Sequence, residues 1–173
     1  EKLVLEYPKA KKFIKKFLGS NELFKGIKRW CLWITDKEKD EALLIPFIKE
    51  RVDRVKNFRL KSKAESTKIA AQYPHKFKQI QSNPEKAIII PCVSSNRRNY
   101  LPIDFIDSDT SISNLGFGIY KPENYIFGII SSTMHIVWLR AVAGRFGEGF
   151  RYSSVLCYNS FVFPKIDNNQ KKI

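Results

Sequence analysis

The stretch KAIIIPCVSSNRRNYLPIDFI, residues 86–106, sets a polar turn between two apolar runs. The first run is short and rich in β-branched residues, which is typical of a buried strand. The second run, residues 100–106, has a similar composition and is predicted to be its partner strand. Between them stand two serines, two asparagines and the adjacent pair Arg97 and Arg98. The stretch therefore predicts a strand, a turn rich in hydrogen-bond donors, and a second strand.

Two elements are predicted near the N-terminus. Residues 7–18, YPKAKKFIKKFL, are expected to form a helix because Pro8 suits a first helical turn and Gly19 suits a helix end. The apolar residues of this segment fall on one face at helical spacing, and its lysines fall on the other. The aromatic and branched residues of 29–34, RWCLWI, favour a short strand.

A longer helix is predicted at residues 46–60, where Pro46 can open the first turn. Ile48, Val52 and Val55 recur there at helical spacing and should face a core. A shorter helix, TKIAAQY at 67–73, is expected to follow, ended by the proline after it. Its candidate caps are Ser62 and Ser66.

Strands dominate the predictions for the second half of the chain. The expected elements are a strand at 111–120, a buried helix at 124–144, a closing strand at 150–164 and a polar tail at 166–173. The sum is an α+β fold with a mixed or antiparallel sheet and with its helices concentrated in the N-terminal half. We expect one compact domain at residues 1–165, in a chain that begins at Glu1 and is a fragment of a longer polypeptide.

Charge gives the first indication of function. The chain has 31 Lys and Arg residues against 17 Asp and Glu, a formal net charge of +14, of which residues 1–90 carry +11. The densest part is 49–78, with ten basic residues against three acidic ones. Such a field attracts polyanions, chiefly nucleic acid, and weakens steeply with salt. A lysine-rich composition kept for solubility would give the same totals, so charge alone does not decide.

Cysteine usage and hydropathy narrow the class of protein. Cys31, Cys92 and Cys157 are odd in number, widely spaced and set among apolar residues, so we expect reduced, buried thiols. The chain has no apolar run near the ~20 residues of a membrane span, and no signal peptide is visible. These features predict a cytoplasmic protein without membrane contact.

Catalytic patterns are weak. The sequence has no glycine-rich phosphate loop and no paired-cysteine metal motif. His75 lies far from His135, which sits in an apolar segment typical of core histidines. Asp104, Asp107 and Asp109 could suggest Mg²⁺, but they follow a strand and are expected to be turn residues. We therefore predict no catalytic, cofactor-binding or metal-binding residue in this chain.

The polar turn carries the side chains that DNA recognition uses. Arginine can donate two hydrogen bonds to the O6/N7 edge of guanine or to phosphate, and asparagine can pair with adenine in the same way. Serine hydroxyls and exposed turn amides are natural phosphate partners. A hairpin turn whose arginines pair with Asp104 or Asp107 is the structural alternative, and the residues alone leave the two readings even.

Five segments follow one another along nearly the whole chain: GSNELFKGIKRWCLWI (19–34), KERVDRVKNFRLKSKAESTKIAAQYPHKF (49–77), IIIPCVSSNRRNYLPIDF (88–105), YIFGIISSTMHIVWLRAVAGRF (125–146) and FRYSSVLCYNSFVFP (150–164). In this order they resemble the target-recognition domain of MmeI-like (type IIL) restriction-modification enzymes and of related adenine-specific DNA methyltransferases. In that family the module follows an N6-adenine methyltransferase domain in one polypeptide. The resemblance implies a part that recognises duplex DNA, in a parent enzyme that methylates it.

The resemblance also implies which residues lie at the DNA. SSNRRNY, residues 94–100, corresponds to the family's SSERR.Y segment at the DNA-reading surface. Arg97, Arg98 and Tyr100 match, whereas Asn96 replaces the acidic residue. Glutamate can accept from cytosine N4, while asparagine favours adenine or a backbone role, so the recognised base is expected to differ. The closing YNSFVFP departs from the usual YNNFPWP at positions expected to be packing.

The match of RVKNFRLKSK at 54–63 implies further contacts from the basic helix. A solvated basic face over a Val/Ile core is the alternative for that helix. The DNA-binding residues that we expect are Arg51, Lys56, Arg59, Ser62, Lys63, Ser94, Ser95, Asn96, Arg97, Arg98, Tyr100, Arg145, Arg151 and Tyr152.

The expected partners are double-stranded DNA and the methyltransferase domain of the same polypeptide. S-adenosylmethionine is expected only in the parent enzyme. We expect this enzyme to be bacterial, and the sequence leaves open whether an endonuclease is fused to it.

Two rival functions stay open. One is a stand-alone RNA or single-strand binder that stacks bases on aromatic side chains, although Trp30, Trp33 and Trp138 lie in apolar runs that suit a core. The other is a hydrolase fragment using His135 with Ser131 or Ser132.

Overall fold

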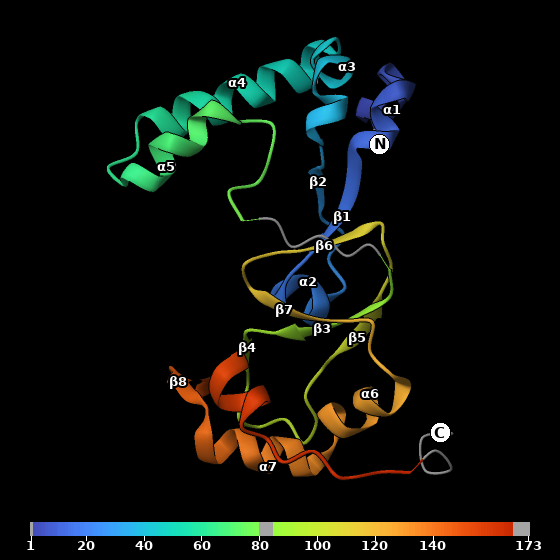
Figure 1. Cartoon of the computed structure of the whole chain (residues 1–173), viewed down its shortest axis with the longest axis vertical. Coiled ribbons are helices and arrows are strands. Elements are labelled where there is room, and N and C mark those ends of the chain that lie inside the picture. Colours follow the sequence, from blue (N-terminus) through green and yellow to red (C-terminus); the bar gives the residue numbers. More distant parts are fainter. Residues whose placement is uncertain (1, 80–84, 168–173) are drawn as a thin grey trace. The chain divides into compact units, whose positions relative to one another are not determined.

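The computed structural model describes residues 2–79 and 85–167 of the 173, and the contacts between them separate the chain into two units. Unit 1 comprises Glu1–Lys16 and Trp30–Ile80, and unit 2 comprises Phe17–Arg29 and Gln81–Ile173. Figure 1 labels their elements. Residues 168–173 of the predicted polar tail lie outside the described residues. The boundary predicted at residue 165 stays a prediction.

Unit 1 is mainly helical. Its elements are α1 (Lys2–Glu6), the 3₁₀ turn η1 (Pro8–Phe13), the first part of β1 (Ile14–Leu18), β2 (Trp30–Leu32), η2 (Asp36–Glu38), α3 (Lys39–Leu43), α4 (Pro46–Leu60), α5 (Glu65–Ile69) and η3 (Ala70–Gln72). Its core gathers side chains from η1, α3 and α4 and from the segments beside them: Ala10, Phe13, Ile34, Ala42, Ile45, Ile48 and Val52.

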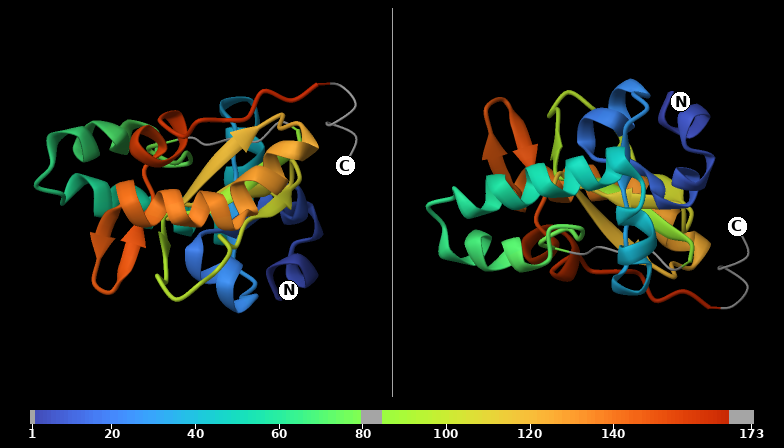
Figure 2. Two further views of the ribbon diagram at one scale, coloured as in Figure 1. Left: turned by 90° about the horizontal axis from the view of Figure 1, so that it is seen from below. Right: turned by 90° about the horizontal axis from the view of Figure 1, so that it is seen from above.

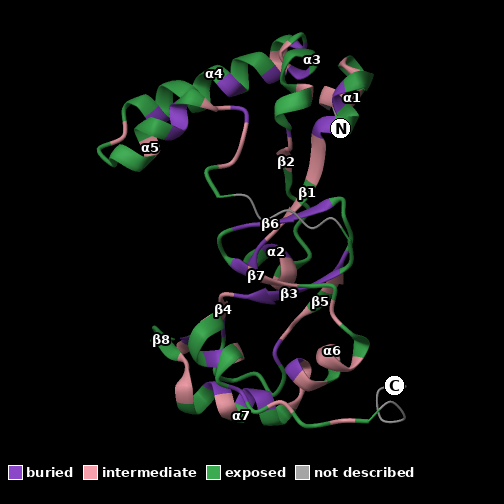
Figure 3. Cartoon of the chain, in the orientation of Figure 1, coloured by how far each residue is buried: buried purple, intermediate pink, exposed green. Residues whose placement is uncertain are grey.

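Helix α4 confirms the helix predicted at 46–60. Pro46 occupies the first turn, where its missing N–H costs nothing, and Ile45 before it is extended. Ile48 and Val52 are buried, as their spacing predicted, but Val55 is 37% exposed. The buried face of α4 therefore includes fewer residues than the apolar spacing predicted. Most of the helix is exposed to solvent (Figure 3).

The helix predicted at 7–18 is wrong beyond Phe13. After the 3₁₀ turn that Pro8 opens, the chain enters β1, whose Ile14, Lys15 and Lys16 pair with β2 in antiparallel register. Pairing with a second strand satisfies the backbone of this segment, which outweighs its weak helix preference. β2 itself confirms the strand predicted at 29–34, although Trp30, expected in the core, is exposed.

The short helix after α4 also begins differently from the prediction. Ala64 is the N-cap of α5, and no side chain caps this helix. Ser62 instead accepts a hydrogen bond from the backbone N–H of Ala64 at 3.2 Å, which makes it a turn residue, and Ser66 lies inside the helix. The predicted caps are therefore wrong.

Unit 2 contains most of the strands. Its elements are α2 (Ser20–Lys25), β3 (Ala87–Pro91), β4 (Val93–Ser94), β5 (Asp104–Ile106), β6 (Thr110–Ile112), β7 (Gly116–Tyr120), α6 (Asn124–Ser131), α7 (Thr133–Val142), β8 (Gly144–Phe146), β9 (Gly149–Arg151) and the π-helical segment η4 (Ser154–Asn159). The α+β class is confirmed, because α1 to α5 precede residue 70 and β3 to β9 follow it.

Strand β3 is the centre of unit 2 and is buried on both faces (Figure 3). It pairs antiparallel with β5 on one side and β7 on the other. Ile88 and Ile90 join the core cluster beneath α6 and α7, whereas Ala87 and Ile89 join the cluster on the opposite face. Each fully buried isoleucine contributes roughly 1.5–3 kcal/mol. The predicted strand is thus confirmed, whereas its partner, predicted at 100–106, is a strand only at Asp104–Ile106.

Two later predictions need correction. Residues 124–144 form two helices that meet at Ser132, which ends α6 and whose hydroxyl caps α7 by accepting from the N–H of His135. Among the described residues no single helix has the length and hydropathy of a membrane span, and α6 and α7 reach them only as a pair bent by 59°.

The strand predicted at 150–164 stops at Arg151. Ser153 then caps η4 by accepting from the N–H of Leu156, and this local hydrogen bond turns the chain away from the sheet. The strand predicted at 111–120 is likewise two strands, β6 and β7, separated by a turn at Ser113 whose hydroxyl accepts from the N–H of Leu115. Serine caps therefore set the ends of elements that apolar patterns alone had merged.

Candidate nucleic-acid interface

A small antiparallel sheet of order β4-β9-β8 positions the polar turn of unit 2. Its register sets Val93 opposite Arg151, and sets Gly144 and Arg145 of β8 opposite Arg151 and Phe150 of β9. The turn that leaves β4 therefore lies beside the β8–β9 hairpin, although about fifty residues separate them in sequence. Figure 2 shows this hairpin at the end of α7.

Two glycines make the hairpin possible. A side chain at Gly149 would place its Cβ only 2.6 Å from the carbonyl oxygen of Ser94, so only glycine lets β9 approach β4 this closely. Gly147 at the tip has a φ of 58°, a left-handed conformation that glycine adopts without strain. The sequence GRFGEGFR thus fixes the hairpin against the turn.

The turn itself is held by its own backbone and by Ser95. The Ser95 hydroxyl accepts from the N–H of Arg97 at 3.2 Å, and the Ser95 carbonyl accepts from the N–H of Arg98 at 3.3 Å. Residues 95–100 are all exposed. An ordered backbone with exposed donors is what base or phosphate recognition requires.

The two adjacent arginines have different environments. Arg97 is 89% exposed, and its Nη2 lies 3.8 Å from Oε2 of Glu148, which is 93% exposed. Such a surface pair contributes little and leaves the guanidinium available. The Arg98 guanidinium lies 4.7 Å from the ring centroid of Phe24, a cation–π contact that restrains it. Within the part of the chain that the structure describes, Arg97 thus pairs with Glu148 and Arg98 packs on Phe24, in place of the alternative pairing with Asp104 or Asp107.

The surface around this turn is strongly basic and carries aromatic side chains. Arg145 and Arg151 are exposed on the hairpin, and β8 is exposed throughout (Figure 3). Residues 91–103 and 133–160 together contain five arginines and a single acidic residue. Tyr100 is 64% exposed and Phe146 is 62% exposed. We call the surface of Asn96, Arg97, Arg98, Tyr100, Arg145, Phe146 and Arg151 the arginine surface.

Two residues predicted to contact DNA, Tyr152 and Ser94, lie inside unit 2. Tyr152 is almost completely buried, and its hydroxyl lies 3.2 Å from Nε2 of His135. Burial raises the pKa of the Tyr152 phenol far above its usual value, as expected for a core residue. Ser94 is 2% exposed. Both side chains therefore belong to the interior of unit 2.

The residues of the basic helix that we predicted to contact DNA lie on α4 and just after it, in unit 1. Arg51, Lys56 and Lys63 are exposed, and the Arg51 guanidinium lies 4.9 Å from the ring centroid of Phe47. Ser62 is half-buried and occupied by its turn hydrogen bond. This geometry fits a phosphate-contacting face for the three basic residues, and it fits a solvated basic face equally.

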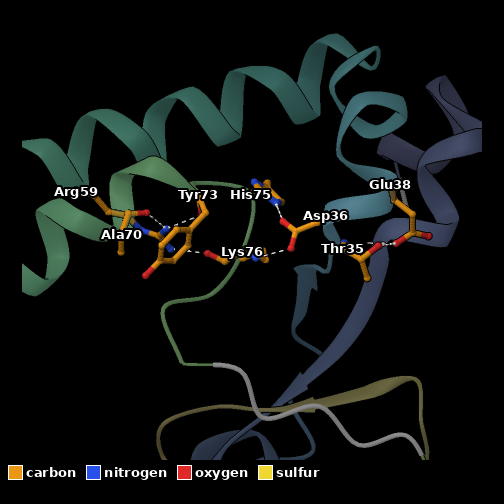
Figure 4. A network of polar contacts seen from close by, with 8 residues as sticks. All are labelled: Thr35, Asp36, Glu38, Arg59, Ala70, Tyr73, His75 and Lys76. Carbon is orange, nitrogen blue, oxygen red and sulfur yellow. Dashed lines mark hydrogen bonds and ion pairs between the residues drawn. The ribbon is translucent and has the colours of Figure 1, made fainter.

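Arg59, predicted on the DNA side, is buried in unit 1 and bonded to backbone carbonyls. It is 9% exposed, and its guanidinium donates to the carbonyl oxygens of Ala70 at 2.7 Å, Tyr73 at 3.0 Å and Lys76 at 2.6 Å (Figure 4). Burial lowers the pKa of this guanidinium, but arginine stays charged. Arg59 therefore fastens the segment after α5 to the end of α4.

The same segment is tied to η2 by a second set of contacts (Figure 4). The carboxylate of Asp36 accepts from Nζ of Lys76 at 2.7 Å and lies 2.9 Å from Nε2 of His75. The hydrogen bond from Lys76, followed by that from His75, lowers the pKa of Asp36. These contacts give His75 a structural role in unit 1.

The residues of the hydrolase alternative serve the fold. The Ser131 and Ser132 hydroxyls donate to the carbonyls of Phe127 and Ile129, within and at the end of α6. His135 is fully buried, its ring packs edge-on against Phe161 at 4.7 Å, and burial lowers its pKa to about 4. These contacts do not form a nucleophile and base.

The remaining sequence predictions concern the aspartates and the cysteines, and the structure confirms them in part. The Asp107 carboxylate accepts from the N–H of Asp109 and from the Thr110 hydroxyl, a turn role as predicted. The described residues contain no group of three or more His, Cys, Asp or Glu side chains arranged to hold a metal ion. All three cysteines are thiols, but only Cys157 is buried, whereas Cys31 and Cys92 are half-buried.

Three residues of the site were missed from the sequence: Arg140, Phe146 and Glu148. Nη2 of Arg140, at the end of α7, donates to the carbonyls of Asn96 at 3.3 Å and Arg98 at 3.2 Å. The glycines around GRFGEG signalled a hairpin there, because such residues punctuate turns. The strand predicted at 150–164 hid that signal.

Comparison with known proteins identifies the family. The model of the MmeI target recognition domain matches residues 1–165. DNA methyltransferase A of Bacillus subtilis (strain 168) is 39% identical over 166 residues, which are 96% of this chain and 19% of that protein. The type IIL restriction-modification enzyme MmeI, solved in complex with DNA, is similar with a TM-score of 0.92 and 36% identity, over 99% of this chain and 23% of MmeI. The chain thus spans about a fifth of the length of these relatives. With a match that covers most of its residues, the chain belongs to the MmeI target recognition domain family.

Proposed function

We propose that this chain recognises a specific sequence in duplex DNA, as one part of a SAM-dependent N6-adenine methyltransferase, and that unit 2 reads bases through the arginine surface. The observation that carries the proposal is the turn at Ser95–Arg98, whose backbone is hydrogen-bonded while the Arg97 side chain stays 89% exposed. Its likeness to MmeI, which was solved with DNA, supports the same reading.

The arginine surface fits duplex DNA in both charge and chemistry. Arginine can bond two acceptors of guanine in the major groove, and further arginines beside it can contact phosphates. Arg97 is the side chain most available for a base edge, because it is 89% exposed and its ion pair with Glu148 is open to solvent. Arg145 and Arg151 are exposed on the adjacent hairpin, on opposite faces by its register, and exposed arginines suit the phosphates. Specificity is thus proposed for the turn, and anchoring for the hairpin beside it.

The parent protein supplies what this chain does not. The match to DNA methyltransferase A supports a methyltransferase as the remaining polypeptide, with S-adenosylmethionine bound there. The match to a restriction-modification enzyme also supports the proposal that the parent protein carries a fused endonuclease. We also propose a cytoplasmic location for the parent protein, where it would meet its DNA substrate.

Mapping methylated adenines in cells that carry the full-length gene tests the proposal. One recurrent motif should be methylated in the wild type, and Arg97→Ala should relax one base of that motif, since a bidentate contact discriminates by about 1–3 kcal/mol. Lys49→Ala, an exposed lysine on α4 that we do not place at the DNA, is the matched control. A motif unchanged in Arg97→Ala would make the turn a scaffold only.

Single-strand binding is the second function to exclude, because Tyr100 and Phe146 are exposed beside the arginines and could stack on bases. The isolated chain should bind duplex DNA non-specifically with a Kd of roughly 10⁻⁴–10⁻⁶ M at physiological salt, and more weakly as salt rises. Tighter binding to single strands of RNA or DNA than to the duplex would favour this alternative.

A further inference from the structure

The end of α7 reaches the turn through Arg140. Its Nη2 donates to two backbone carbonyls, those of Asn96 and Arg98, which flank Arg97 on either side. Both contacts bind the main chain rather than a side chain. They therefore restrain the path of the turn whatever residues occupy its positions.

Helix α7 is a firm support for such a contact. Its inner face consists of His135, Ile136 and Leu139, all of which are completely buried. Leu139 immediately precedes Arg140, so the guanidinium projects from a part of the helix that packing has fixed in place. The hydrogen bonds thus connect the exposed turn to the core of unit 2.

The contacts of Arg140 complement those of Ser95. Ser95 holds the N–H groups of Arg97 and Arg98, whereas Arg140 holds the carbonyls of Asn96 and Arg98. Together they restrain each residue of the turn through its backbone. A side chain that must meet a base edge within a few tenths of an ångström gains from such restraint, because the ordering entropy is lost before binding.

We propose that Arg140 is a positioning residue for base readout: it fixes the turn so that Asn96 and Arg97 present their side chains to the DNA in one orientation. This inference rests on the proposed function of the arginine surface. A phosphate contact is the competing role for an exposed arginine, and the two roles predict different results. A phosphate contact weakens all sequences alike, whereas a positioning residue affects the preferred sequence most.

The test compares Arg140→Ala and Arg140→Lys with Arg145→Ala in the full-length protein. The measurement is the ratio of kcat/KM on the preferred site to that on sites with one base changed, at several salt concentrations. We expect Arg140→Ala to lower this ratio roughly 5- to 100-fold at one base pair while the salt slope changes little. Arg140→Lys should keep the charge but restore little of the ratio, because an ammonium lacks the planar geometry of the guanidinium.

A uniform loss on all sites, with the salt slope reduced by about 0.9 and rescue by lysine, would make Arg140 a phosphate contact and overturn the proposal. An unchanged ratio would overturn it as well. Thermal unfolding of each variant checks that unit 2 stays folded.

A second measurement separates this inference from the proposed function. Backbone order parameters of residues 96–98 should be near ~0.85 in the wild-type chain and fall below ~0.6 in Arg140→Ala. Unchanged order parameters would refute positioning by themselves. If the wild-type protein preferred no sequence, the proposed function would fail, and the order parameters would still decide whether Arg140 orders the turn.

Discussion

Replacing Arg59 with alanine should destabilise unit 1 strongly. The guanidinium donates three hydrogen bonds of 2.6–3.0 Å to the carbonyls of Ala70, Tyr73 and Lys76. Hydrogen bonds to a charged group contribute roughly 1.5–3 kcal/mol each, but contributions from one side chain do not add, and losses above ~4–5 kcal/mol are rare for a single substitution. Water can also reach part of this segment. We therefore expect a loss of about 3 kcal/mol in the free energy of unfolding.

The assay is urea and thermal unfolding of the chain, with exchange of amide hydrogens in unit 1 to locate the change. A loss of about 3 kcal/mol corresponds to a fall in Tm of roughly 6–12 °C for a chain of this size. Arg54→Ala is the matched control on the same helix, because Arg54 forms a solvent-exposed ion pair with Glu50 at i,i+4, and it should stay within ~0.5 kcal/mol of wild type. The reasoning is refuted if Arg59→Ala leaves stability unchanged and instead lowers the salt slope of DNA binding, as a phosphate contact would.

Three further predictions follow from charge and burial. Glu148→Gln should raise affinity for any duplex by up to about fivefold, because it removes the acidic side chain beside Arg97; a weaker complex in a fluorescence titration would contradict this. Lys56→Ala and Arg145→Ala should each reduce the slope of log K against log salt by about 0.9 if their side chains neutralise one phosphate, and an unaltered slope would show a merely solvated residue. Burial lowers the pKa of His135 to about 4, so the unfolded chain binds a proton that the folded chain does not between pH 6.5 and 4. Stability should therefore fall as pH drops through that window, by at most about 1.4 kcal/mol per pH unit, and His135→Gln should lose this dependence in pH-dependent unfolding.

Patterns within a single segment predicted those helices and strands that are marked by a long apolar run and by clear boundary residues. The helix at 46–60 and the strand beginning at Ala87 each have an apolar run of the right length and a clear boundary. The helix expected at 7–18 failed because its second half pairs with β2, a partner that helical spacing within the segment cannot reveal. A single serine, Ser132, divides α6 from α7 inside a run that reads as uniformly apolar.

In the candidate site, the sequence likewise did not show which polar side chains are buried and which are exposed. Arg59 and Lys56 look alike in the sequence, yet one is buried against carbonyls 11 to 17 residues away and the other is exposed. Tyr152 directly follows Arg151, the last residue of β9, and the alternation of the strand continues through it, so that Arg151 is exposed and Tyr152 is buried. Sequence resemblance located the segments of the site, whereas only the pleat of the sheet and the hydrogen-bond partners decide which side chains of each segment face outward.

In the turn at residues 95–98, the groups that hold the backbone in place differ from the side chains that we propose to contact bases. Among the described residues, the hydrogen bonds that fix residues 96–98 use their backbone atoms, with Ser95 and Arg140 as the side-chain partners. The side chains of Asn96 and Arg97 take no part in that support, so substitution there leaves the support intact. Base preference can therefore change at these two positions while the fold of the surface is conserved, since the free energy that orders the turn comes from residues outside the reading positions.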